Sequence, residues 1–197
     1  MTDRSPADDV LRLDTAALAV LAHPLRSRLL TELRLHGAAT ATELADRLDT
    51  NTGATSYHLR KLESVGLVVD TGTGTGKRRV WDASTRGHGW QPSDFAGDEA
   101  AEHSLAWLHR YYVAQLAAHA EAWFDVERTW PDRWRDALGY GDAGVVVTPE
   151  QARAMYDEIE AVLRRYRDLG RDQPGAEQLL VATIVVPVDP RAPGAAR

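Results

Sequence analysis

The chain has 197 residues, a net charge of −6 at pH 7 and no cysteine. Without cysteine, disulfides and thiolate metal sites are excluded. No apolar run is long enough to cross a bilayer, and the polar first dozen residues do not resemble a signal peptide. We therefore expect a cytoplasmic protein with no membrane partner, long enough for one good core and a second small domain.

The negative charge is distributed unevenly along the chain. Residues 15–90 carry ten Lys or Arg and seven Asp or Glu, whereas residues 91–197 carry eleven and eighteen. The basic excess therefore falls in the first half and the acidic excess in the second, which indicates a division of labour between them.

The segment from Thr40 to Trp81 predicts a helix, a turn, a second helix and a β-hairpin, in that order. Thr40 and Glu43 have the spacing of a capping box, so the first helix is expected to begin near residue 41. The second is expected over residues 52–64, followed by Gly66, which can adopt the left-handed conformation that ends helices.

The predicted hairpin has strands over residues 67–70 and 79–82. The sequence TGTGTGK between them has three alternating glycines, which favours a flexible tip, and it is followed by two arginines. This order of elements is that of a winged helix-turn-helix, which places its second helix in the major groove of DNA and its basic hairpin against the backbone.

The predicted DNA contacts lie on the side of the second helix opposite its apolar residues, and on the hairpin. Thr55, Leu59 and Leu62 have the spacing of an inward face, so the other face is free for base edges and phosphates. Contacts from the hairpin to phosphates would be sensitive to salt. The predicted DNA-binding residues are Thr42, Gly53, Ser56, Tyr57, Arg60, Lys61, Lys77, Arg78 and Arg79.

The segments AHPLRSRLLTEL, ATELADRL, TSYHLRKLESVGLV and GKRRVW resemble the ArsR-type branch of winged-helix bacterial transcription regulators, over residues 15–85. The resemblance implies that residues 23–33 form the first long helix and residues 56–62 lie in the recognition helix. It also implies a homodimer that binds a roughly palindromic double-stranded DNA operator and usually represses until a ligand releases it. His58 matches a family position and is expected to pack within the domain, and His23 is expected to shape a helix start.

The second half of the chain predicts a linker, a long helix and a small mixed domain. Residues 84–98 read as a linker. Residues 99–128 predict a helix with apolar residues on two sides, which indicates the main dimerisation helix. A short helical piece at 131–138 precedes a predicted strand at 143–148, a helix from Pro149 and a strand at 178–188, which together predict a β-α-β unit with parallel strands.

The expected fold class is therefore α+β, with an N-terminal winged helix-turn-helix, a long dimerisation helix and a small β-α-β C-terminal domain. The expected domains are a disordered tail at 1–13, the winged helix-turn-helix at 14–83, the linker at 84–98, a dimerisation and β-α-β effector or interaction domain at 99–189, and a disordered tail at 190–197.

Four of the six tryptophans lie between residues 107 and 134. Together with nearby tyrosines they are candidates to line a pocket for a flat or apolar small-molecule effector. Alternatively, they fill the core and the dimer interface, where aromatic residues are enriched. The candidate ligand-binding residues are Trp107, Tyr111, Trp123 and Trp130.

Neither a cofactor nor a metal site is expected. The spacings of His103, His109, His119 and Glu121 do not match the paired carboxylate and histidine site of metal-sensing regulators, which argues against a site within one chain. A metal-responsive regulator whose His and carboxylate site is shared across a dimer stays an alternative. An enzyme is not expected, because no phosphate-binding loop and no nucleophile motif is present. A winged-helix adaptor that binds protein instead of DNA is a further alternative, against which the basic hairpin argues.

Overall fold

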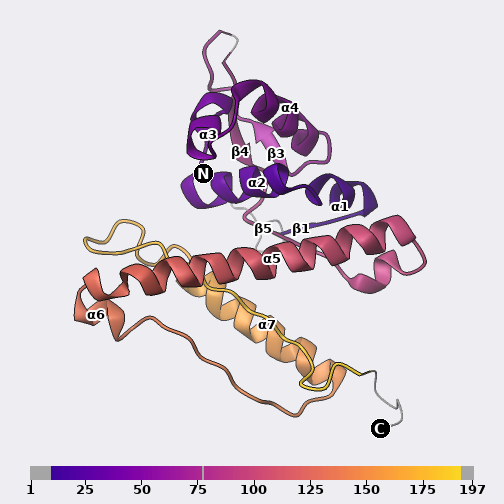
Figure 1. The fold of residues 1–197 in the computed structure, drawn as a ribbon, viewed down its shortest axis with the longest axis vertical. Helices are drawn as coiled ribbons and strands as arrows, with labels where there is room; N and C mark the ends of the chain where they lie inside the picture. The colour runs from indigo at the N-terminus through magenta and orange to yellow at the C-terminus, as the bar shows by residue number, and fades with distance from the viewer. Residues whose placement is uncertain (1–9, 77, 192–197) are drawn as a thin grey trace. The chain divides into compact units, whose positions relative to one another are not determined.

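The computed structural model describes residues 10–76 and 78–191, and the chain divides into two compact units, residues 1–120 and 121–197 (Figure 1). Most of the two predicted disordered tails, residues 1–9 and 192–197, lies outside the described residues. The fold class is α+β, with an N-terminal winged helix-turn-helix and a long helix, as the sequence predicts.

The first unit holds the winged helix-turn-helix and the start of the long helix. Its elements are β1 (Val10–Arg12), α1 (Thr15–Leu21), α2 (Pro24–His36), β2 (Ala39–Thr40), α3 (Ala41–Arg47), α4 (Thr52–Glu63), β3 (Val68–Asp70), β4 (Val80–Ala83), β5 (Gly87–Gly89), the 3₁₀ helix η2 (Pro92–Phe95) and most of α5 (Glu99–Val126).

The ends of the two helices of the helix-turn-helix are fixed by local side chains. The Thr40 side chain accepts from the Glu43 backbone N–H at 3.3 Å, and the Glu43 carboxylate accepts from the Thr40 N–H at 2.7 Å, which completes the predicted capping box. Asn51 caps α4 by accepting from the Ala54 N–H at 2.8 Å. Gly66, with φ of +73°, follows α4 as predicted.

A three-stranded sheet closes one side of the helices. Its strand order is β2-β4-β3, and both pairings are antiparallel. Trp81 on β4 pairs with residues of both neighbouring strands and is only 2% exposed. The hairpin between β3 and β4 protrudes beyond α3 and α4, as a wing does (Figure 1).

One apolar core joins the helices, the sheet and the start of α5. The predicted inward residues of α4 are buried, Leu44 and Ala45 of α3 are buried as well, and α5 adds its own first turns to the same core. Because leucines from all five helices α1 to α5 meet in this core, the helix-turn-helix is held rigidly from behind. Core members from these helices include Leu29, Leu33, Leu44, Leu59, Leu62, Leu105 and Leu108.

Parts of the predicted N-terminal tail and linker are ordered, which corrects two expectations. Residues 10–12 form β1, which pairs in parallel with β5 inside the predicted linker. The next residue, Leu13, is buried, as is Phe95 of η2. The sequence did not reveal this pairing because residues 87–89, Gly-His-Gly, have no apolar alternation typical of a strand.

The long helix α5 leaves the core part-way along its length. Leu105 and Leu108 are buried and Tyr112 is packed against the core, whereas Val113 and Phe124 are 54% and 50% exposed. The predicted helix is confirmed, and its second half carries exposed apolar residues in both units.

The second unit contains the end of α5, a 3₁₀ helix η3 (Glu127–Thr129), α6 (Asp132–Arg135) and α7 (Pro149–Tyr166). The predicted helix from Pro149 is confirmed, but the two strands of the predicted β-α-β unit are absent from the described residues. Residues 143–148 and 178–188 are extended without ladder partners, and Val146 and Val188 are almost fully exposed. Apolar, β-branched sequence favours a strand only where another strand pairs with it.

None of the helices in the described part of the chain is both long enough and apolar enough to span a bilayer.

Candidate nucleic-acid interface

The outer face of α4 carries most of the residues predicted to contact DNA. Tyr57 is 53% exposed, Gly53, Arg60 and Lys61 are exposed, and Ser56 is half-buried. The opposite face is closed, since Thr55, Leu59 and Leu62 are fully buried. The helix thus presents a polar surface on one side only, as a recognition helix requires.

The two cations of this face lie along the helix. The Arg60 Nε donates to the Ser56 carbonyl at 3.0 Å, and the Lys61 ammonium lies 5.8 Å from the centre of the Tyr57 ring. These contacts hold both side chains near the surface residues of the preceding turn without neutralising either charge. Thr42 on α3 is exposed as well.

The cations of the wing differ from one another in their surroundings. Arg79 lies 3.4 Å from the Asp70 carboxylate and 3.8 Å from that of Glu63, and its guanidinium lies 5.7 Å from the centre of the Trp81 ring. These contacts tie the wing to the end of α4. Arg78 is exposed, and Lys77 lies outside the described residues.

Electrostatic contact also links the wing to α3. Hydrogen bonds from Thr40 hold the pKa of the Glu43 carboxyl below its usual value, and the charges of Arg78 and Arg47 act in the same direction. The carboxylate therefore stays ionised in its capping role. Cationic side chains from α3 and the wing accordingly lie near the same carboxylate.

The backbone of the wing requires glycine at several of its alternating positions, and does not merely use glycine for flexibility as the sequence suggested. Gly72 and Gly76 have φ of +71° and +64°. A Cβ on Gly74 would lie 1.8 Å from the Arg78 carbonyl oxygen, so the two sides of the hairpin meet there backbone to backbone. Any other side chain at position 74 would force Arg78 to move.

Replacing Gly74 with alanine should therefore weaken duplex binding by roughly tenfold, the scale of losing one or two phosphate contacts. The melting temperature should change little, because the hairpin tip lies outside the core. Thr75→Ala is the matched control, since Thr75 is exposed and its backbone carbonyl, not its side chain, accepts from the Arg78 N–H. Equal affinities of the two variants in a fluorescence anisotropy titration would show that wing geometry is unimportant.

Two histidines pack behind the recognition helix, as expected. His23 caps α2 by accepting from the Leu25 N–H at 3.2 Å, and its ring centre lies 4.5 Å from that of His58 on α4. Burial is the main cause that lowers the pKa of both rings, and the nearby Arg26 charge acts in the same direction. Both rings are thereby favoured in the neutral form, which suits packing between α2 and α4.

A half-buried polar chain that the sequence did not predict connects α2, β5 and α5. Arg34 donates to the Thr85 carbonyl at 3.1 Å and to the Nδ1 of His88, and the His88 Nε2 lies 2.8 Å from the Tyr112 hydroxyl. Because arginine only donates, Nδ1 must accept and Nε2 must carry the proton that it donates to Tyr112.

Burial and the Arg34 charge lower the pKa of His88 to about 3, so its ring is neutral at physiological pH. Burial likewise raises the pKa of Tyr112 and lowers that of Arg34 to about 10. Trp90 stacks beside both rings, with ring centres 5.8 Å from His88 and 6.3 Å from Tyr112. This chain fixes α5 to the helix that precedes the helix-turn-helix.

The candidate ligand-binding residues form two separate aromatic pairs. Trp107 and Tyr111 stack in the first unit with ring centres 5.0 Å apart. Trp123 and Trp130 meet edge to face in the second unit at 5.3 Å. Only Trp130 of these four lines the pocket described next.

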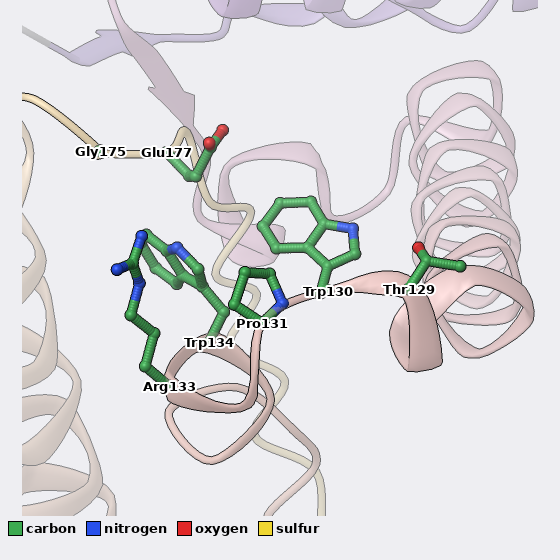
Figure 2. Close-up of a pocket in the computed structure, with 7 residues that line it drawn as sticks. All are labelled: Thr129, Trp130, Pro131, Arg133, Trp134, Gly175 and Glu177. Carbon is green, nitrogen blue, oxygen red and sulfur yellow. The ribbon is translucent and has the colours of Figure 1, made fainter.

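The second unit contains an open pocket of about 300 Å³. Figure 2 shows the indoles of Trp130 and Trp134 on either side of Pro131, and their ring centres lie 6.2 Å apart. One guanidinium and one carboxylate contribute to the rim. The lining residues are Thr129, Trp130, Pro131, Arg133, Trp134, Gly175 and Glu177. Within residues 10–76 and 78–191, no three histidine or acidic side chains are grouped so that they could hold a metal ion.

Comparison with known proteins places a helix-turn-helix domain at residues 21–71. Among solved structures, reduced HlyU from Vibrio cholerae N16961 is similar, with 24% identity over 49% of this chain and 85% of that chain and a TM-score of 0.32. No curated protein matches the sequence. The helix-turn-helix match covers α2 to the start of the wing and supports a DNA-binding transcription regulator.

Proposed function

We propose that this chain is a sequence-specific, DNA-binding transcription regulator of the ArsR type, acting by binding and not by catalysis. The observation that carries the proposal is that α4 is buried on one face and exposes polar and basic side chains on the other. Its inward face is completely buried, while Tyr57, Arg60 and Lys61 stand exposed beside the cationic wing. A buried inner face fixes the orientation of the outer face, so the outer side chains can enter a major groove together.

The proposal assigns different tasks to different side chains. Ser56 and Tyr57 carry hydroxyl groups on the outer face of α4 and would contact base edges, with Gly53 allowing close approach of the backbone. Arg60, Lys61 and Arg78 would contact phosphates, as would Lys77, which precedes Arg78 in the sequence, and Thr42 would contact the flank. Arg79 would instead hold the wing in position, because it already lies against Glu63 and Asp70.

We further propose that the regulator acts in the cytoplasm as a homodimer, joined through α5, on a roughly palindromic operator. The exposed apolar residues in the second half of α5, Val113, Phe124 and Val126, support this role. Repression that is relieved by an organic small molecule follows from the family resemblance. The pocket around Trp130 and Trp134 is the candidate effector site, suited to a flat or apolar ligand.

The decisive experiment is selection of genomic duplexes by the purified chain, followed by affinity measurements on the selected sequence and on random DNA. Ser56→Ala and Tyr57→Ala should each reduce the preference for the selected sequence by about tenfold, the scale of one lost base contact. Tyr57→Phe keeps the ring near Lys61 and removes only the hydroxyl, so it should lose the preference as far as Tyr57→Ala does if the hydroxyl makes the base contact.

Two results would contradict the proposal at different levels. If no duplex binds at low salt, the chain is not a DNA-binding regulator and the protein-binding adaptor is favoured. If every duplex binds equally and the α4 variants leave this unchanged, the protein binds DNA without reading its sequence through α4.

A further inference from the structure

The helix α7 carries a regular apolar stripe. Thr148 and Gln151 form a capping box at its start, which fixes where the helix begins. From there the apolar residues recur at alternating steps of three and four, a heptad pattern that favours pairing with another helix. The stripe consists of Ala152, Met155, Ile159, Val162 and Tyr166, followed by Leu169 just after the helix.

The chain itself buries this stripe only in part, since Ala152, Met155 and Ile159 are half-buried. Val162, Tyr166 and Leu169 are 45%, 59% and 60% exposed, and no residue of α7 is buried. Indeed, no residue in the described part of the second unit, residues 121–191, is buried. An apolar heptad stripe with this much exposed area indicates a surface that pairs with another helix.

The charges of α7 indicate what that partner is. Residues 149–160 carry four acidic side chains and one basic, whereas residues 161–171 carry four basic and one acidic. A second copy of the same helix in antiparallel orientation would bring the acidic half of each against the basic half of the other. A parallel copy would bring like charges together.

We propose that two copies of this chain pair through α7 in antiparallel orientation about a two-fold axis. In this register Met155 packs against the partner's Tyr166, and Ile159 against the partner's Val162. The small Ala152 lies opposite the partner's larger Leu169. Each contact occurs twice by symmetry, so one stripe covers the other along its whole length.

The same register brings Glu158 against the partner's Arg165, because both flank the stripe on the same side. Both side chains are exposed, and neither forms an ion pair with another residue in the described part of the chain. Arg165 lies over the Tyr166 ring, 5.3 Å from its centre. By contrast, Glu160 already lies 4.0 Å from Arg164 within the helix. The pairing is independent of the proposed DNA contacts, which belong to the first unit.

Disulfide trapping tests this pairing directly, since the chain has no cysteine of its own. Met155→Cys and Tyr166→Cys chains, carrying different affinity tags, are co-expressed as full-length proteins without operator DNA and then oxidised. Antiparallel pairing predicts disulfides between the two variants, whereas parallel pairing predicts disulfides of each variant with itself. Only disulfides within one variant, or no cross-linking above that of exposed Arg153→Cys chains, would overturn the proposal.

Charge reversal in the Met155→Cys and Tyr166→Cys chains tests the proposed register of the two α7 helices. Glu158→Arg or Arg165→Glu alone should slow cross-linking by about tenfold, because each places like charges opposite twice. The double reversal restores the opposite pairing and should return the rate to within about twofold of the parent. Asp157→Arg, one residue away on the outer face, is the matched control. If the double reversal stays as slow as the single ones, the proposed register is wrong, whether or not the protein binds DNA.

Discussion

Replacing Arg60, Lys61 and Arg78 together with alanine should lower affinity for every duplex, by on the order of a hundredfold near 0.1 M salt. The three cations lie on α4 and the wing, exposed on the surface proposed to face DNA. Each phosphate contact releases condensed counterions, so the slope of log affinity against log salt should become shallower by roughly 2 to 3. Fluorescence anisotropy at four or five salt concentrations gives both quantities.

The control must remove the same charge elsewhere. Arg110, Arg128 and Arg153 are exposed and lie outside the proposed interface, so their triple alanine variant changes the net charge equally. It should keep the parental salt slope. If both triple variants lose affinity to the same extent, binding depends on overall charge, and the docking through α4 and the wing is incorrect.

Acid should destabilise the fold through His88. Its pKa is about 3 in the folded protein against an ordinary value of 6.5, so between these values the unfolded chain holds a proton that the folded chain does not. The contribution of the neutral His88 ring to the free energy of unfolding is therefore complete above pH 6.5 and is lost progressively as the pH falls towards 3. The free energy of unfolding should fall by about 1.4 kcal/mol per pH unit from this group alone.

His88→Gln isolates this contribution, because glutamine can still accept from Arg34 and donate to Tyr112 but does not titrate. Urea unfolding at pH 6, 5 and 4 should show a shallower pH dependence in this variant than in the parent. His23 and His58 act in the same direction in both proteins, so the difference belongs to His88. A parental slope in His88→Gln would contradict a neutral, half-buried ring.

The sequence predicted those features that depend on neighbouring residues. Thr40 and Glu43 are three apart, so their capping box is a local event, and Leu59 and Leu62 define one face of one helix. The recognition helix and wing could be located for the same reason. The position of Gly66 after α4 likewise needed no knowledge of the rest of the chain.

Features that depend on distant partners were missed or wrongly assigned. Arg34 and His88 are 54 residues apart, and nothing in either neighbourhood indicates that they meet. The parallel pairing of β1 with β5 joins segments of which one, Gly-His-Gly, has no strand character. Conversely, residues 178–188 have strand character, but they pair with no strand among the described residues, because a strand needs a partner strand as well as a suitable sequence.

The distribution of tryptophan makes the two units optically separable. Trp81 lies buried in the sheet beneath Arg79, at the base of the wing, whereas Trp123, Trp130 and Trp134 belong to the second unit. Substituting phenylalanine for the tryptophans of one unit leaves intrinsic tryptophan emission from the other alone, and replacing Trp90 and Trp107 as well leaves Trp81 as the single reporter at the wing. DNA binding at the wing and occupation of the indole pocket can thus be recorded as distinct signals, without an external label.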